Sequence, residues 1–110
     1  MNETIDVSAI VTVGSRYDRT GKLASEYLAV LKKSGKSFEL IFVLDGEREK
    51  IVPALTELAK ENSQVRLFQL SRPFGEAAAL TAGFEHANGR EILTLPAYYQ
   101  VDSAAIGDFL

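Results

Sequence analysis

The chain has 110 residues, of which 46% are hydrophobic and 25% charged, a composition typical of a soluble globular domain. Fifteen acidic and twelve basic side chains give a net charge of −3, which argues against a nucleic-acid partner. The absence of cysteine excludes disulfides, thiolate metal sites and cysteine nucleophiles, and a single histidine, His86, excludes a metal site with two imidazoles. Neither a secretory signal nor a membrane span is recognisable, so we expect one cytoplasmic domain over residues 1–110.

Along the whole chain, stretches in which apolar residues are spaced as in a strand alternate with stretches in which they are spaced as in a helix. Largely apolar runs, typical of strands buried on both faces of a sheet, predict strands at residues 5–13, 38–44, 65–70 and 91–95. Amphipathic stretches predict helices at residues 19–33, 47–61 and 75–87, and a last helix beginning at Asp102 or Ser103. The third helix is rich in small residues, which would let it lie close to a sheet. This alternation predicts an α/β fold in which a parallel sheet lies between layers of helices.

The end of the chain is unusual because it carries two large apolar residues, Phe109 and Leu110, where protein termini are usually polar. We therefore expect these 110 residues to be the first part of a longer protein. The fourth strand, residues 91–95, would then be an exposed sheet edge. Exposed edges recruit further strands, so a homodimer through this strand is a second expectation.

Ligands of an open parallel sheet bind beyond the carboxyl ends of its strands. The segments in question are residues 14–18, 44–47, 71–75 and 96–100. They do not form a P-loop, because six residues separate Gly14 from Gly21 where four are required, and no G-x-G-x-x-G motif occurs. The ends of the first and third strands also lack the acidic cluster of a phospho-accepting receiver domain.

The order of these segments resembles the N-terminal half of family 2 glycosyltransferases. The matching stretches read AIVTVGSRYD, FELIFVLDG, SRPFGEAAALTAGFEHANGR and PAYYQVD. They are most similar to the polyprenyl-phosphate, or dolichol-phosphate mannose, sugar transferases. The resemblance implies the GT-A fold, a Rossmann-like three-layer α/β/α sandwich with a mainly parallel sheet, here truncated. It also implies a parent enzyme, at the cytoplasmic face of a membrane, that transfers a sugar from UDP or GDP to a lipid phosphate or glycan.

The resemblance assigns nucleotide-sugar binding to five residues. Asp45 stands at the second position of the family's acidic pair, which contacts the nucleotide, and Leu44 replaces the first. Arg72 matches the arginine of the S-R-N-F-G loop, where a guanidinium suits a diphosphate. Gly75 of the same loop would allow close backbone approach, and Thr12 and Ser15 would bond the base.

Local sequence leaves simpler interpretations open for the same residues. Asp45 and Gly46 also form a typical turn at the end of a strand. Arg72 is also consistent with a solvated surface arginine, although we favour the binding role, whereas for Thr12 and Ser15 we favour ordinary loop polarity.

The family's metal-binding D-x-D motif is absent. Its two positions are occupied by Pro96, which has no donor group, and Tyr98, whose phenol stays protonated near neutral pH. We therefore assign no metal ligand, no Mg²⁺ or Mn²⁺ cofactor and no catalytic residue, and we expect this part of the chain to be inactive alone. Together with Leu44, these replacements support an alternative, in which a degenerate pseudo-glycosyltransferase acts as a scaffold or regulatory module.

Overall fold

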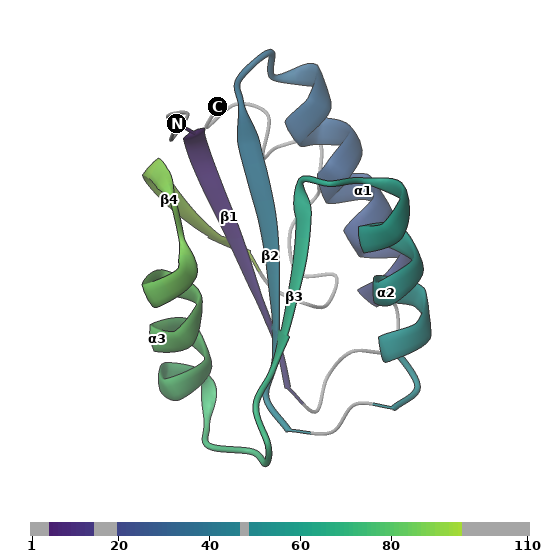
Figure 1. Ribbon diagram of the computed structural model, residues 1–110, viewed down its shortest axis with the longest axis vertical. Coiled ribbons are helices and arrows are strands. Elements are labelled where there is room, and N and C mark those ends of the chain that lie inside the picture. The colour runs from purple at the N-terminus through teal and green to yellow at the C-terminus, as the bar shows by residue number, and fades with distance from the viewer. Residues whose placement is uncertain (1–4, 15–19, 47–48, 96–110) are drawn as a thin grey trace.

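The computed structural model describes residues 5–14, 20–46 and 49–95. In chain order these residues form β1 (Ile5–Val13), α1 (Thr20–Lys33), β2 (Phe38–Leu44), α2 (Val52–Glu61), β3 (Val65–Gln69), α3 (Glu76–His86) and β4 (Gly89–Leu95). The strands form one sheet in the order β3-β2-β1-β4, and every pair is parallel. Helices α1 and α2 cover one face of this sheet and α3 covers the other (Figure 1). The predicted three-layer α/β/α fold is confirmed.

The strand order explains why the helices lie on two faces. From β1 to β3 each new strand is added on the same side of the previous one, and the two crossover helices, α1 and α2, pack on one face of the sheet. The next crossover, through α3, returns past β2 and β1 to reach β4 on the far side of the sheet. Because crossovers between parallel strands are right-handed, this reversal places α3 on the opposite face. The order therefore reverses between β1 and β4, which is where open α/β sheets bind ligands.

The core has two layers because side chains alternate across the strands. The larger layer lies under α1 and α2, and its fully buried members include Val11, Leu23, Tyr27, Phe42 and Leu55. The smaller layer lies under α3 and is built from Ile10, Ile41, Val43 and Ala79. Every residue of β2 is buried, as expected for a central strand covered on both faces.

Helix α3 lies unusually close to the sheet, as its small residues predicted. Ala79 is fully buried, and a Cβ atom added at Gly83 would lie only 2.7 Å from Cγ2 of Ile10. Real Cβ contacts are longer, so any side chain at position 83 would force Ile10 or α3 to shift.

Replacing Gly83 with alanine is expected to lower the free energy of unfolding by about 1 kcal/mol. Overpacking against Ile10 costs roughly 1–3 kcal/mol, and the higher helix propensity of alanine offsets up to about 1 kcal/mol of that. The matched control is Gly21→Ala in α1, whose new Cβ would meet Ala54 Cβ at an ordinary 3.5 Å and should be neutral or stabilising. Urea unfolding of both variants checks the prediction, and a Gly83→Ala protein at least as stable as the parent would contradict it.

Several element boundaries differ from the prediction; among them, β3 ends at Gln69 rather than at residue 70 and α3 ends at His86 rather than at residue 87. Helix α2 begins at Val52 rather than at residue 47, and residues 49–51 form a turn. Pro53 accounts for this, because a proline inside a helix clashes with the carbonyl group four residues earlier and is tolerated only in the first turn. Helix α3 begins after Gly75, whose φ of 103° is not helical, and β4 begins at Gly89, which pairs with Ile5.

The described residues test only part of what the sequence predicts for the last helix and the fourth strand. The predicted helix at residues 102–110 lies outside the described residues. Within the described chain β4 pairs with β1 alone, so it is a sheet edge as predicted. Self-association through that edge stays a prediction. None of the helices in the described ranges is long and apolar enough to cross a bilayer.

Candidate functional site

The carboxyl ends of β1, β2 and β3 lie side by side at the lower end of the sheet in Figure 1, which we call its carboxyl edge. The backbone N–H of Asp45, just after β2, donates to the carbonyl of Val13 at the end of β1 (2.9 Å). The N–H of Leu70, just after β3, donates to the carbonyl of Leu44 (2.9 Å). Three of the four predicted ligand segments thus begin side by side. The fourth, residues 96–100, lies outside the described residues.

Asp45 connects the end of β2 to the start of α3. Its side chain is buried, and Oδ1 accepts a hydrogen bond from the N–H of Phe74 at 2.7 Å. The N–H of Gly75 lies 3.1 Å from Oδ2 and 3.3 Å from Oδ1. Backbone amides at a helix start favour a negative charge. Asp45 is therefore more than the simple turn residue that local sequence allowed.

Gly46 brings the loop after β2 against the loop after β3. Its φ is +93°, and an added Cβ would lie 2.8 Å from both Cγ and Cδ of Pro73. A residue with a side chain would be strained by the backbone angle and would also collide with the proline ring. The two loops are consequently in direct contact.

Arg72 and Gly75 complete the loop between β3 and α3. Arg72 is exposed, with its guanidinium carbon 5.0 Å from the ring centre of Phe74, which is itself 52% exposed. This distance is that of a cation–π contact. Gly75 has a φ of +103°, and its carbonyl accepts the N–H of Ala79 at 3.1 Å, which begins α3. The arginine is thus held at the carboxyl edge of the sheet with its charge facing solvent.

The other predicted positions are less informative. Thr12 lies one residue before the end of β1 and is half-buried, and Ser15 lies outside the described residues. Leu44, which replaces the family's first aspartate, is fully buried in the core layer under α1 and α2. His86 is the last residue of α3, at the opposite edge of the sheet from Asp45, where its ring stacks on Phe68 at 4.1 Å.

The described residues do not fit a metal ion. They contain no group of three or more histidine, cysteine, aspartate or glutamate side chains close enough to share one. Pro96 and Tyr98, which stand at the family's metal-binding positions, lie outside the described ranges and lack a suitable donor.

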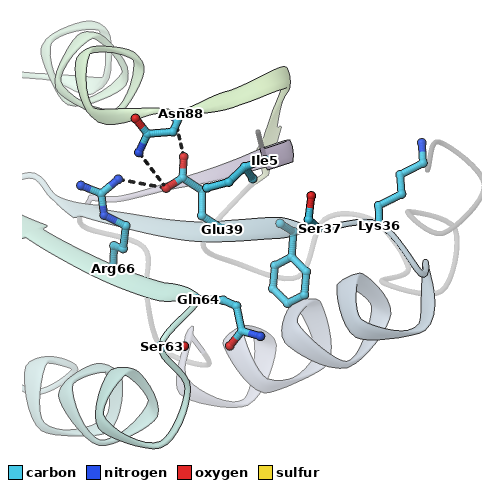
Figure 2. Close-up of a pocket in the computed structure, with 9 residues that line it drawn as sticks. Ile5, Lys36, Ser37, Glu39, Ser63, Gln64, Arg66 and Asn88 are labelled. Atoms are coloured by element: carbon cyan, nitrogen blue, oxygen red, sulfur yellow. Dashed lines mark hydrogen bonds and ion pairs between the residues drawn. The ribbon is translucent and has the colours of Figure 1, made fainter. Parts of the chain in front are cut away.

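A second polar cluster, which the sequence analysis missed, lies at the amino ends of the strands (Figure 2). At its centre Glu39 of β2 is 3% exposed. The Glu39 carboxylate accepts hydrogen bonds from Ser8 Oγ (2.6 Å), the N–H of Asn88 (2.6 Å) and an Arg66 guanidinium nitrogen (2.9 Å). Burial opposes ionisation, but the bonds from Ser8, Asn88 and Arg66 and the positive charge of Arg66 outweigh it, so the pKa of Glu39 is lowered.

The Glu39 cluster joins elements that are distant in sequence. The same Arg66 nitrogen donates to the carbonyl of His86 at 2.7 Å, and Ser8 Oγ accepts the N–H of Gly89 at 2.7 Å. A pocket of about 480 Å³ adjoins it, lined in part by Lys36, Glu39 and Arg66. Since the carboxylate is already saturated by groups of the chain itself, its role is structural. The sequence signal was one acidic residue inside the apolar run FELIFVL.

Comparison with known proteins gives consistent results. The sequence profile of glycosyl transferase family 2 matches residues 10–107. An undecaprenyl-phosphate 4-deoxy-4-formamido-L-arabinose transferase of Shewanella sediminis is 36% identical over 101 residues, which are 90% of this chain and 30% of that protein. An uncharacterized glycosyltransferase of Synechocystis sp. is 31% identical over 97 residues, 88% of this chain and 30% of that protein. The chain thus spans about 30% of the length of these relatives.

Two solved structures share the fold. The S. aureus protein TarS (residues 1–349) superposes with a TM-score of 0.69 at 18% identity, covering 96% of this chain and 31% of TarS. The mannosyltransferase PcManGT from Pyrobaculum calidifontis, solved with GDP-Man and Mn²⁺, gives a TM-score of 0.67 at 17% identity, covering 96% of this chain and 32% of PcManGT.

Proposed function

Because the chain belongs to glycosyl transferase family 2, we propose that it forms the part of a glycosyltransferase that binds the nucleotide-diphosphate sugar. The observation that carries the proposal is the joining of the ends of β1 and β2 to the Arg72 loop. This edge adjoins the reversal of strand order, where α/β sheets bind nucleotides. The planar guanidinium of Arg72 is exposed and can bind a phosphate through two parallel hydrogen bonds. A UDP- or GDP-sugar is the proposed donor.

We propose a lipid phosphate as the acceptor used by the whole protein. The names of several relatives, which are undecaprenyl-phosphate sugar transferases, support this assignment. Because the chain spans only about 30% of those proteins, acceptor binding and proton transfer are assigned to residues beyond this chain. A lipid acceptor would place the whole enzyme at a membrane, with the donor site on its cytoplasmic side.

Thermal unfolding in the presence of nucleotides tests donor binding. UDP or GDP, or one of their sugars, is expected to raise the melting temperature, because a ligand at 100 times its Kd stabilises the folded state by about 2.7 kcal/mol. Adding Mn²⁺ should change little, since Pro96 and Tyr98 cannot ligate it. Arg72→Ala should abolish most of the shift, whereas Arg90→Ala, a matched exposed arginine at the amino end of β4, should leave it unchanged. No shift with any nucleotide would refute the proposal.

A second candidate function is that of a scaffold whose donor site has degenerated. The specific observation in its favour is Leu44, which is buried in the core where the family has an aspartate. In this case the wild-type chain should bind no nucleotide sugar, and a protein partner is expected at Tyr98 and Tyr99, which lie outside the described residues. Saturable binding of any nucleotide sugar that Arg72→Ala abolishes would exclude this candidate.

A further inference from the structure

The carboxylate of Asp45 is already bound to the backbone at the start of α3. Its oxygens accept hydrogen bonds from Phe74 at 2.7 Å and from Gly75 at 3.1 and 3.3 Å, and the residue is 7% exposed. We propose that Asp45 is a positioning residue, which holds the loop of residues 70–75 so that Arg72 can bind the donor diphosphate. This inference rests on the proposed function, because it concerns the same site.

The amides bound by Asp45 are those that would otherwise attract a phosphate. The first N–H groups of a helix have no partner within the helix and often bind anions. Here the N–H groups of Phe74 and Gly75 point to the Asp45 carboxylate instead. Because these two N–H groups already have an acceptor, they are not available to the donor diphosphate. The exposed guanidinium of Arg72 is then the group of this loop that can bind it.

The loop that carries Arg72 is fixed on both sides of this residue. On its amino-terminal side the N–H of Leu70 is bound to the carbonyl of Leu44 at 2.9 Å. On its carboxyl-terminal side Pro73 contacts Gly46, and Phe74 is bound to Asp45. Three consecutive residues at the end of β2, 44–46, thus hold the loop before and after Arg72. Loss of the Asp45 carboxylate would remove the attachment at Phe74.

A double-mutant cycle separates positioning from direct contact with the nucleotide. The dissociation constants of UDP and GDP would be measured by NMR titration for the wild type, Asp45→Ala, Arg72→Ala and the double variant. Each single substitution is expected to weaken binding at least tenfold. The double variant should bind no more than twofold more weakly than Arg72→Ala, because Asp45 acts through Arg72. If the two losses multiply, Asp45 contacts the nucleotide by itself and the inference is overturned.

Two further variants guard against unfolding and against a purely structural effect. Asp45→Asn keeps the Oδ1 acceptor, so it should retain the affinity within threefold. Asp45→Glu keeps the charge but displaces the oxygens by one methylene, so it should weaken binding at least threefold and do so only when Arg72 is present. This variant replaces Asp45→Ala in the cycle if the alanine variant does not fold. In the wild type and Arg72→Ala, the amide hydrogens of Phe74 and Gly75 should exchange more slowly than in Asp45→Ala or Asp45→Glu.

The outcomes distinguish this inference from the proposed function. If the wild type binds neither UDP nor GDP, both are refuted. If the wild type binds and Arg72→Ala weakens binding while Asp45→Ala does not, donor binding stands and the positioning role is refuted. Weaker binding by Asp45→Asn than by Asp45→Glu would also overturn positioning, because it would show that charge rather than loop geometry matters.

Discussion

Replacing Glu39 with alanine should lower the free energy of unfolding by about 3 kcal/mol. The substitution leaves Ser8 Oγ and the N–H of Asn88 without their acceptor and removes the ion pair of Arg66, whose nitrogen keeps its bond to the carbonyl of His86. Each buried donor without a partner costs roughly 1–3 kcal/mol, and breaking a buried ion pair costs about 3–5 kcal/mol. Because the Arg66 side chain is 33% exposed, water can compensate part of its loss, which favours the lower end of this range.

Urea unfolding at pH 7 measures this effect against two controls. Glu39→Gln keeps the shape and one acceptor oxygen, so it should cost less than the alanine variant. Glu57→Ala removes an exposed carboxylate from α2 and should change the free energy of unfolding by less than about 0.5 kcal/mol. A Glu39→Ala protein within 1 kcal/mol of the wild type would show that the cluster contributes little.

The contribution of Glu39 should depend on pH in a defined direction. Its pKa in the folded state is lowered from 4.5, so the unfolded chain binds its proton more readily than the folded chain does. The stabilisation is therefore complete above about pH 4.5 and is lost as the pH falls through the folded pKa. Unfolding measured from pH 7 downward should show the difference between wild type and Glu39→Gln shrinking below that pH. A difference that grows on acidification would contradict the assignment.

Replacing Gly89 with alanine is the second substitution expected to cost about 3 kcal/mol. An added Cβ would lie 2.5 Å from the backbone nitrogen of Ser8, 2.6 Å from its Oγ and 2.8 Å from the carbonyl carbon of Val7. These atoms belong largely to the backbone of the buried strand β1, which cannot move aside as a flexible side chain could. The cost should therefore reach the upper end of the usual 1–3 kcal/mol for overpacking.

Gly14→Ala is the matched control, because Gly14 also borders β1 but an added Cβ there has nothing within 4 Å. Urea unfolding should show a change of less than about 0.5 kcal/mol for this variant. For Gly89→Ala, amide hydrogen exchange should in addition be faster along β4 than along β2, since the clash separates β4 from β1. Equal stability of the two variants would show that β1 and β4 are less closely packed than described.

The sequence predicted the order and type of the described elements because each has a recognisable hydrophobic pattern. Strands such as β2 are largely apolar, and the apolar residues Leu23, Tyr27 and Leu31 lie on one side of α1. Both patterns can be recognised from residues that are close in sequence. The start of α2 was wrong because the amphipathic pattern continues back past Val52, whereas Pro53 limits the helix by sterics. Periodicity reports which residues are buried, and a helix start depends on backbone geometry as well.

The polar residues were less predictable because their partners are distant in sequence. Asp45 and Arg72 were expected at the carboxyl edge, and the structure places both there. The bonds of Asp45 reach residues 29 and 30 positions away, which no local pattern shows. Glu39 is bound to residues 31, 27 and 49 positions away, so its cluster becomes visible only when the sheet is assembled.

The distribution of Glu39 partners also bears on how fast the protein folds and unfolds. Its partners come from β1, β3 and the residue before β4, so the last of them arrives only after α3 has crossed the sheet. Bonds absent from the transition state slow unfolding without accelerating folding. The bond from Asn88 should therefore act mainly on the lifetime of the native state, whereas the bonds from Ser8 and Arg66 can form as soon as β1, β2 and β3 have paired.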